Sequence, residues 1–204
     1  MKKLHDPIRV FRRHHGILRT SEAIKGGIHP RVLYRLRNEG IVESLGRGVF
    51  RLLSMPDFSE PDLVLVAKRM PQGVICLISA LAHYELTTQI PHFVYVALPR
   101  TVKSRPNFDY PPFRCFWYSA QTYAAGIETI SINGFPVQIY SIEKTLVDCV
   151  KFRNKIGKDV MLEAFKEYWR RGKTDVNKLY AFARLCRVEK VLTPIMETIV
   201  SIYD

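Results

Sequence analysis

The segment from residue 21 to residue 53 carries closely spaced helix and turn signals, which constrain the fold more than any other part of the chain. Ser21 is suited to cap a helix that Gly26-Gly27 would end. Pro30 fits the first turn of a second helix, because it has no backbone N–H to lose there. Gly40 can then close that helix in the left-handed conformation. The spacing predicts two short helices joined by a glycine turn.

A β-hairpin is predicted to follow, because β-prone residues from Ile41 to Leu53 flank Gly46-Arg47-Gly48. Helix, turn, helix and hairpin together predict a winged helix-turn-helix, a module that lays one helix into a DNA groove. In the predicted reading helix, Pro30–Glu39, Leu33 and Leu36 face the core. The candidate DNA-binding side chains are those left outward, with one at the wing tip: Arg31, Tyr34, Arg35, Asn38 and Arg47, with Arg37 on the same helix.

A further helix is predicted before this unit, because Asp6 can cap it, Pro7 can open it and Gly16 can end it. Phe11 should pack inward and complete a three-helix core. The basic outer edge of this helix is predicted to contact DNA phosphates through Arg12 and Arg13.

The charge is concentrated at the N-terminus. Of the formal net charge of +12, residues 1–53 carry 12 basic and 4 acidic side chains, which gives +8. Such a basic segment favours binding to a polyanion, because each phosphate that it neutralises releases condensed counterions. We therefore expect double-stranded DNA as a partner. An RNA partner is less favoured, because this segment has no aromatic-rich strand for stacking unpaired bases.

The remainder of the chain has an α+β pattern. A linker or capped helix start at residues 55–61 separates a predicted domain at 1–55 from one at 62–204. Strands in the middle, including a hairpin at Asn133-Gly134, precede a helical tail. The helices are expected at residues 62–70, 79–86, 142–152, 158–171, 175–187 and 190–203.

The sequence does not predict an enzyme, a cofactor or a metal site. His83, Glu85 and His92 suit a helix end and loop as well as a site. Lys144 and Asp148 are four apart on one helix and are interpreted as an exposed ion pair. The chain has no phosphate-binding glycine loop, no nucleophile elbow and no acid followed by E-x-K on a strand.

The cysteines and hydropathy favour a cytoplasmic protein. The cysteines are far apart in apolar surroundings, which predicts buried free thiols in a reducing compartment; they are Cys76, Cys115, Cys149 and Cys186. No run of about 18 apolar residues predicts a membrane span, and the N-terminus does not have the pattern of a secretory signal.

Three blocks of sequence resemble successive landmarks of the AbiEi-type antitoxin family. They are GGIHPRVLYRLRNEGIVESLGRGVFRL, SALAHYELTTQIPHFVYVALPR and YSIEKTLVDCVKFRNKIGKDVMLEAFKEY. The resemblance extends from about residue 7 to residue 171, and the order of the second and third blocks is the more telling part. It implies a winged helix-turn-helix followed by a C-terminal antitoxin domain.

Such antitoxins typically repress their own operon and counteract a toxin with a nucleotidyltransferase fold, in phage-defence or stress systems. The resemblance therefore implies an antitoxin and autorepressor with a nucleotidyltransferase-like toxin as its partner. A candidate antitoxin surface lies on basic residues after Ser141: Lys151, Arg153, Lys155 and Lys158. The role of the tail after about residue 172 is left open.

The alternative is a free-standing winged regulator whose C-terminal domain senses a ligand or dimerises. The aromatic residues that could line a pocket for such a ligand are Tyr95, Phe113, Phe116, Trp117 and Tyr118. Core packing explains most of these rings more simply, because alternate residues of a strand face inward.

Overall fold

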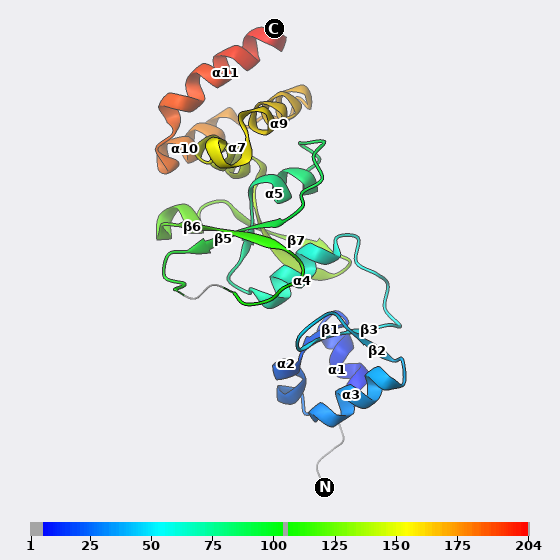
Figure 1. The fold of residues 1–204 in the computed structure, drawn as a ribbon. Helices are drawn as coiled ribbons and strands as arrows, with labels where there is room; N and C mark the ends of the chain where they lie inside the picture. The colour runs from blue at the N-terminus through cyan, green and yellow to red at the C-terminus, as the bar shows by residue number, and fades with distance from the viewer. Residues whose placement is uncertain (1–5, 104–105, 204) are drawn as a thin grey trace.

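The computed structural model of the protein describes residues 6–103 and 106–203. Figure 1 shows a small N-terminal unit at one end, a mixed sheet in the middle and a layer of helices at the other end. Helices and sheets both contribute to the fold, so the α+β prediction is confirmed.

The N-terminal unit packs short helices onto a three-stranded antiparallel sheet of order β1-β3-β2. Its elements are α1 (Pro7–Arg13), β1 (Ile17–Arg19), α2 (Thr20–Lys25), α3 (Pro30–Asn38), β2 (Val42–Ser44) and β3 (Val49–Leu52). Strand β1 was not predicted, because three residues are too few to show a period. It exists through pairing with β3, which sequence periodicity does not reveal.

The predicted start of α1 and end of α3 are confirmed, whereas α1 ends at Arg13, before the predicted stop at Gly16. Asp6 Oδ1 accepts the N–H of Ile8 at 3.0 Å, and Pro7 opens α1. Gly40 has a φ of +69°, and the carbonyl of Leu36 then accepts the N–H of Ile41 at 2.9 Å. This left-handed turn ends α3 and directs the chain into β2.

The predicted cap at Ser21 is wrong. Helix α2 begins one residue earlier, at Thr20, and the Glu22 carboxylate accepts the N–H of Arg19 at 2.7 Å. The Glu22 carboxylate, three residues after the N-cap Arg19, thus accepts the N–H of the N-cap residue, as in a capping box.

The second sheet has five strands in the order β6-β5-β4-β8-β7. Pairs β5/β6 and β4/β8 are parallel, whereas β4/β5 and β7/β8 are antiparallel. The predicted hairpin at Asn133-Gly134 is confirmed, with φ of +49° and +86° at its two residues. The strands are β4 (Val74–Ile75), β5 (Val94–Pro99), β6 (Phe113–Tyr118), β7 (Ile127–Ile132) and β8 (Phe135–Tyr140).

Helices cover both faces of this sheet. Helix α4 (Pro61–Arg69) packs against β5 and β8 on the face toward the N-terminal unit. The opposite face carries α5 (Leu77–His83) and α7 (Ile142–Lys151), and Ser141 Oγ caps α7 by accepting the N–H of Lys144 at 3.4 Å. The remaining helices are α6 (Ala120–Ala124), α8 (Arg153–Ile156), α9 (Lys158–Arg170), α10 (Val176–Cys186) and α11 (Glu189–Tyr203).

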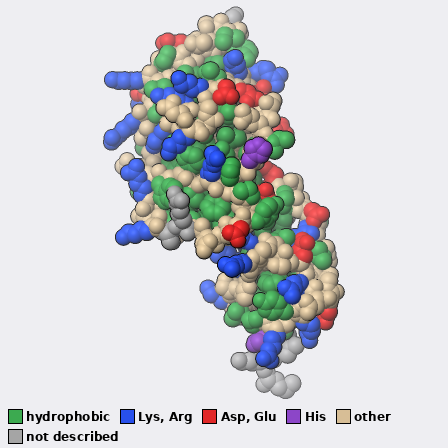
Figure 2. Space-filling model, viewed as in Figure 1, with side chains coloured by type: hydrophobic (Ala, Val, Ile, Leu, Met, Phe, Trp, Pro, Cys, Tyr) green, Lys and Arg blue, Asp and Glu red, His purple; other side chains and the backbone are tan. Residues whose placement is uncertain are grey.

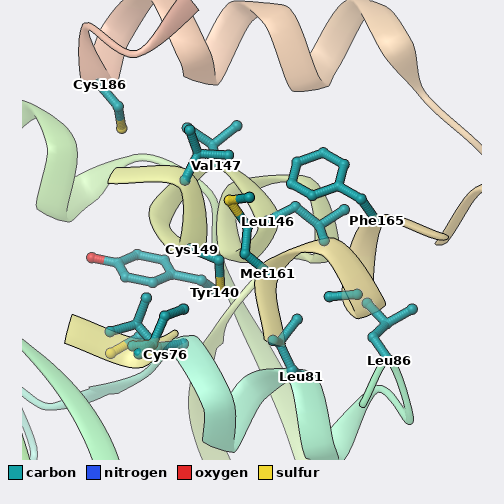
Figure 3. Packing of buried hydrophobic residues seen from close by; sticks show 14 of the residues in the cluster. Cys76, Leu81, Leu86, Tyr140, Leu146, Val147, Cys149, Met161, Phe165 and Cys186 are labelled. Carbon is teal, nitrogen blue, oxygen red and sulfur yellow. The ribbon is translucent and has the colours of Figure 1, made fainter. Parts of the chain in front are cut away.

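The alternation along β5 separates two apolar cores. Val94 and Val96 face α4, whereas Tyr95 and Ala97 face the helical layer. Figure 3 shows the second of these cores, where side chains of α7 and α9 meet those of α5. Burial on both faces agrees with the place of β5 inside the sheet, between β6 and β4.

The two units share apolar contacts. Ile17 of β1 and Val49 of β3 are buried in the same cluster as Leu63 of α4 and Phe135 of β8. The His15 ring lies edge-on to Phe135, with 6.0 Å between ring centroids. The three-stranded sheet of the N-terminal unit thus packs toward the C-terminal unit, and α3 lies on the side away from it (Figure 1).

Polar bonds reinforce this junction. Lys68 of α4 is 7% exposed, and its Nζ lies 2.7 Å from Glu22 Oε2. Arg19 donates to the Lys68 carbonyl, and Arg69 Nη2 donates to the Leu45 carbonyl at 3.0 Å. Although burial opposes ionisation of Glu22, the Arg19 N–H and Lys68 hold the pKa of its carboxyl below the ordinary value.

Two predictions about which side chains are buried are wrong. Lys144 and Asp148 are both 0% exposed, with 2.5 Å between Nζ and Oδ2, so the pair lies in the core and not on the surface. Burial raises the pKa of Asp148 although Lys144 opposes the shift. Cys115 is only half-buried, because it lies on the outer strand β6, whereas the other cysteines are buried as expected.

Candidate nucleic-acid interface

Helix α3 presents one apolar and one polar face. Leu33 and Leu36 are buried against the rest of the N-terminal unit, with 1% and 6% exposure. The outward face is exposed and carries the predicted reading residues Arg31, Tyr34, Arg35 and Asn38, together with Arg37. The predicted reading residues are therefore brought together on one helix surface.

Tyr34 contacts both the buried core and a cation on this face. Its ring is half-exposed and lies edge-on to the buried ring of Phe50, with 6.2 Å between centroids. The Arg37 guanidinium lies 5.2 Å from the Tyr34 ring centroid, and its Nη2 donates to Asn38 Oδ1 at 3.3 Å. Phe50 thus packs against Tyr34, Tyr34 packs against Arg37, and Arg37 bonds Asn38.

The ends of the helix add two further cations. At the first turn, His29 Nδ1 accepts the backbone N–H of Arg31 at 3.2 Å. The Arg31 side chain is exposed to solvent. Arg35 Nε lies 3.8 Å from Glu39 Oε1, and both side chains are exposed. An exposed pair of this kind contributes about 0–1 kcal/mol, so Arg35 can leave Glu39 for a phosphate or a base at little cost.

Arg47 lies at a different place. The hairpin tip turns through Gly46 and Gly48, which have φ of +106° and +67°. Arg47 is exposed there and lines a small hollow with Arg69 and the segment Asn107–Tyr110. The predicted wing residue is therefore exposed at the hairpin tip, beside the junction with the C-terminal unit and apart from the side chains on α3.

The described part of the N-terminal unit carries further unpaired cations. Arg12 and Arg13 are exposed at the last turn of α1. In contrast, Arg51 is bound to Glu43 and Asp57. Lys2 and Lys3, which enter the sequence charge count, lie outside the described residues.

The basic residues expected to form an antitoxin surface extend over three helices. Lys151 Nζ and Lys155 Nζ lie 5.8 and 5.7 Å from the ring centroid of Phe152. Arg153 Nη1 donates to the Val150 carbonyl at 2.8 Å, whereas Lys158 is exposed at the start of α9. Lys151 and Lys155 thus both lie near the Phe152 ring, whereas the Arg153 guanidinium bonds a backbone carbonyl and Lys158 lies in solvent.

The aromatic residues considered for a pocket separate into two groups. Tyr95, Phe116 and Tyr118 are buried in the helical-side core, with 7%, 8% and 1% exposure. Phe113 and Trp117 are only half-buried, and together with Phe116 they line a surface cavity of about 610 Å³ beside β6. Sequence reasoning could not separate the groups, because β6 was not known to be the outermost strand.

The described residues give no group of three or more metal-ligating side chains. His83 Nδ1 contacts Glu60 Oε2 at 2.8 Å, and this links α5 to the segment before α4. No helix within residues 6–103 or 106–203 is long and apolar enough to cross a membrane.

Comparisons with known proteins bear on both parts of the chain. The solved structure of the RV2827C protein from Mycobacterium tuberculosis aligns with a TM-score of 0.57 and 13% identity, over 87% of this chain and 69% of that one. At this identity the likeness shows the fold alone. A search of curated proteins gave no match.

The N-terminal unit matches a family model. Residues 5–53 match the family described as "Transcriptional regulator, AbiEi antitoxin". The match covers α1 to β3 and supports a regulator of a toxin–antitoxin system. Residues 5–53 are thus similar to the AbiEi antitoxin family of transcriptional regulators, and the resemblance inferred from the sequence is confirmed for this segment.

Proposed function

We propose that the N-terminal unit is a winged helix-turn-helix that binds the promoter of its own operon and represses it. The observation that carries this proposal is the outward face of α3, where cationic, amide and aromatic side chains are exposed above buried Leu33 and Leu36. A helix of this kind fits the major groove of B-DNA. The family match at residues 5–53 supports the same function.

The side chains would divide between bases and phosphates. Arg35 and Asn38 lie on the outward face, and guanidinium and amide groups form bidentate pairs with guanine and adenine. Arg31 and Tyr34 complete this surface. Arg12, Arg13 and Arg47 would contact phosphates, which adds affinity without sequence preference.

The junction bears on how the hairpin would meet DNA. Because Arg69 holds the Leu45 carbonyl, the position of the hairpin depends on the C-terminal unit. We propose units at 1–55 and 62–204 with separate functions, although their apolar residues pack in one cluster. DNA binding is therefore best measured with the full chain, with segment 1–60 as a second sample.

A salt titration tests the DNA-binding proposal. About six phosphate contacts would give a slope of roughly −5 for log K against log salt concentration. The measurement uses gel shifts on a fragment of the chain's own promoter, with a random duplex as the control. Binding to the promoter that is no tighter than binding to the random duplex would contradict repression by α3.

We further propose that residues 62–204 counteract a nucleotidyltransferase-like toxin. The support is the resemblance of the second and third sequence blocks and the basic surface on α7 to α9. Co-expression with the toxin gene next to this one should restore growth. Charge reversal at Lys151, Arg153, Lys155 and Lys158 in the full chain should abolish rescue if that surface acts; rescue by the reversed variant would exclude it.

The second candidate is a free-standing regulator whose C-terminal unit senses a ligand. The cavity of about 610 Å³ beside β6 favours it, because such a volume accommodates a small molecule. Absence of a toxin gene beside this gene, together with ligand-dependent promoter binding, would favour this candidate over the antitoxin.

A further inference from the structure

The cavity beside β6 combines aromatic and cationic side chains. It has a volume of about 610 Å³ and is lined by Pro106, Phe113, Arg114, Cys115, Phe116, Trp117 and Lys155. None of these described lining residues is acidic. Figure 2 shows Lys and Arg side chains along the left edge of the upper part of the molecule, the side on which Figure 1 places β6.

The rings of the cavity are held by packing. Phe116 stacks on Tyr95, with 5.8 Å between ring centroids and an interplanar angle of 23°. Phe113 contacts Phe108 at 4.4 Å between centroids. The indole Nε1 of Trp117 donates to the Val102 carbonyl at 3.4 Å. Because Phe116 is only 8% exposed, the half-buried rings of Phe113 and Trp117 offer most of the aromatic surface to a ligand. Rings held by packing lose little freedom when a ligand stacks on them.

Two cations stand beside these rings. Arg114 Cζ lies 4.2 Å from the ring centroid of Phe93, and Lys155 Nζ lies 5.7 Å from that of Phe116. Within the part of the chain that the structure describes, neither forms an ion pair with a carboxylate. Both charges are therefore available to an anion.

These features together select a ligand class. An apolar ligand would leave two cations unused, and a simple anion would leave the aromatic rings unused. We propose that this cavity binds a nucleotide, through a base stacked on the rings and a phosphate at Arg114 and Lys155. The nucleotide is either free or the end of a nucleic-acid strand, since any base can stack on an aromatic side chain.

The site is independent of promoter reading by α3, because it lies on the C-terminal unit. It also gives Lys155, one of the four residues of the proposed antitoxin surface, a phosphate to contact. Binding should weaken as the salt concentration rises, because exposed charges are screened.

Fluorescence provides a direct test. The chain has two tryptophans, so Trp169→Phe leaves Trp117 as the only indole reporter. Adenosine 5′-monophosphate should quench this fluorescence with saturation if the free nucleotide is the ligand. A 5′-phosphorylated trinucleotide that quenches where the mononucleotide does not would assign the site to a nucleic-acid end. Calorimetry on the unmodified protein checks that Trp169→Phe has not altered the site.

Charge reversal identifies the phosphate contacts. Arg114→Glu with Lys155→Glu should weaken binding by about tenfold or more, because charge-assisted bonds are lost. Lys173→Glu with Lys190→Glu, at two exposed positions away from the cavity lining, is the matched control. No quenching by either ligand at millimolar concentration, or equal affinity in the reversed and control variants, would overturn the proposal. Promoter binding measured on the same samples separates this outcome from failure of the proposed function.

Discussion

The buried Lys144–Asp148 pair gives the sharpest prediction about stability. Both side chains are 0% exposed, and the other neighbours of Lys144 Nζ include the rings of Tyr140 and Tyr118, 4.1 and 4.9 Å from their centroids. Removing Asp148 leaves a buried ammonium that those rings compensate only weakly, and removing Lys144 leaves a buried carboxylate that the ring faces do not compensate. Lys144→Met or Asp148→Asn should therefore each lower the free energy of unfolding by about 3–5 kcal/mol, a large part of a typical domain's stability.

The pair also predicts a pH dependence and a non-additive double variant. In Lys144→Met, loss of the ammonium raises the pKa of Asp148 further above its value in the unfolded chain. The protonated carboxyl then contributes stability that is fully present below the unfolded-state pKa. That stability is lost as the pH rises through the folded-state pKa. The penalty should be smaller at pH 5 than at pH 8 in urea denaturation. Lys144→Met with Asp148→Leu should cost less than either single variant. Additive penalties that do not change with pH would refute this reasoning.

Two further predictions concern the N-terminal unit. Glu22→Gln should remove stability that is present above the ordinary pKa of 4.5 and lost as pH falls through the lowered folded pKa, so thermal melts of variant and parent should converge at low pH. Lys68→Met tests the same contact from α4, and a variant–parent difference that stays constant with pH would contradict it. Gly40→Ala should cost about 1 kcal/mol from its φ of +69° alone, because no atom lies within 4 Å of an added Cβ; an unchanged melting temperature would exclude that strain.

The sequence predicted local features well and long-range ones poorly. Asp6 and Gly40 act as expected, because caps and left-handed turns depend on a few neighbouring residues. The Lys144–Asp148 spacing was interpreted as exposed, because spacing of four shows that two side chains share a helix face but not what covers that face. The outer position of β6 depends on pairing with β5 in a parallel register, which no local pattern encodes.

In the candidate site, too, local features were predictable from the sequence and long-range ones were not. The outward face of α3 was predictable, because Leu33 and Leu36 define its apolar side. The place of Arg47 was not, since it depends on Arg69 of α4 holding the hairpin. The cation–ring contact of Arg37 with Tyr34 had a signal in the sequence, a spacing of three on one helix, but not a direction.

The central claim, that α3 reads the promoter, is tested most directly by measuring affinity for promoter and random DNA with two single variants. Arg35→Ala and Asn38→Ala should each weaken promoter binding by about 1–3 kcal/mol and change binding to random DNA little. Arg47→Ala is the matched control, because loss of a phosphate contact should weaken both duplexes alike. Equal losses on both duplexes for all three variants would contradict the assignment of α3 as the reading helix.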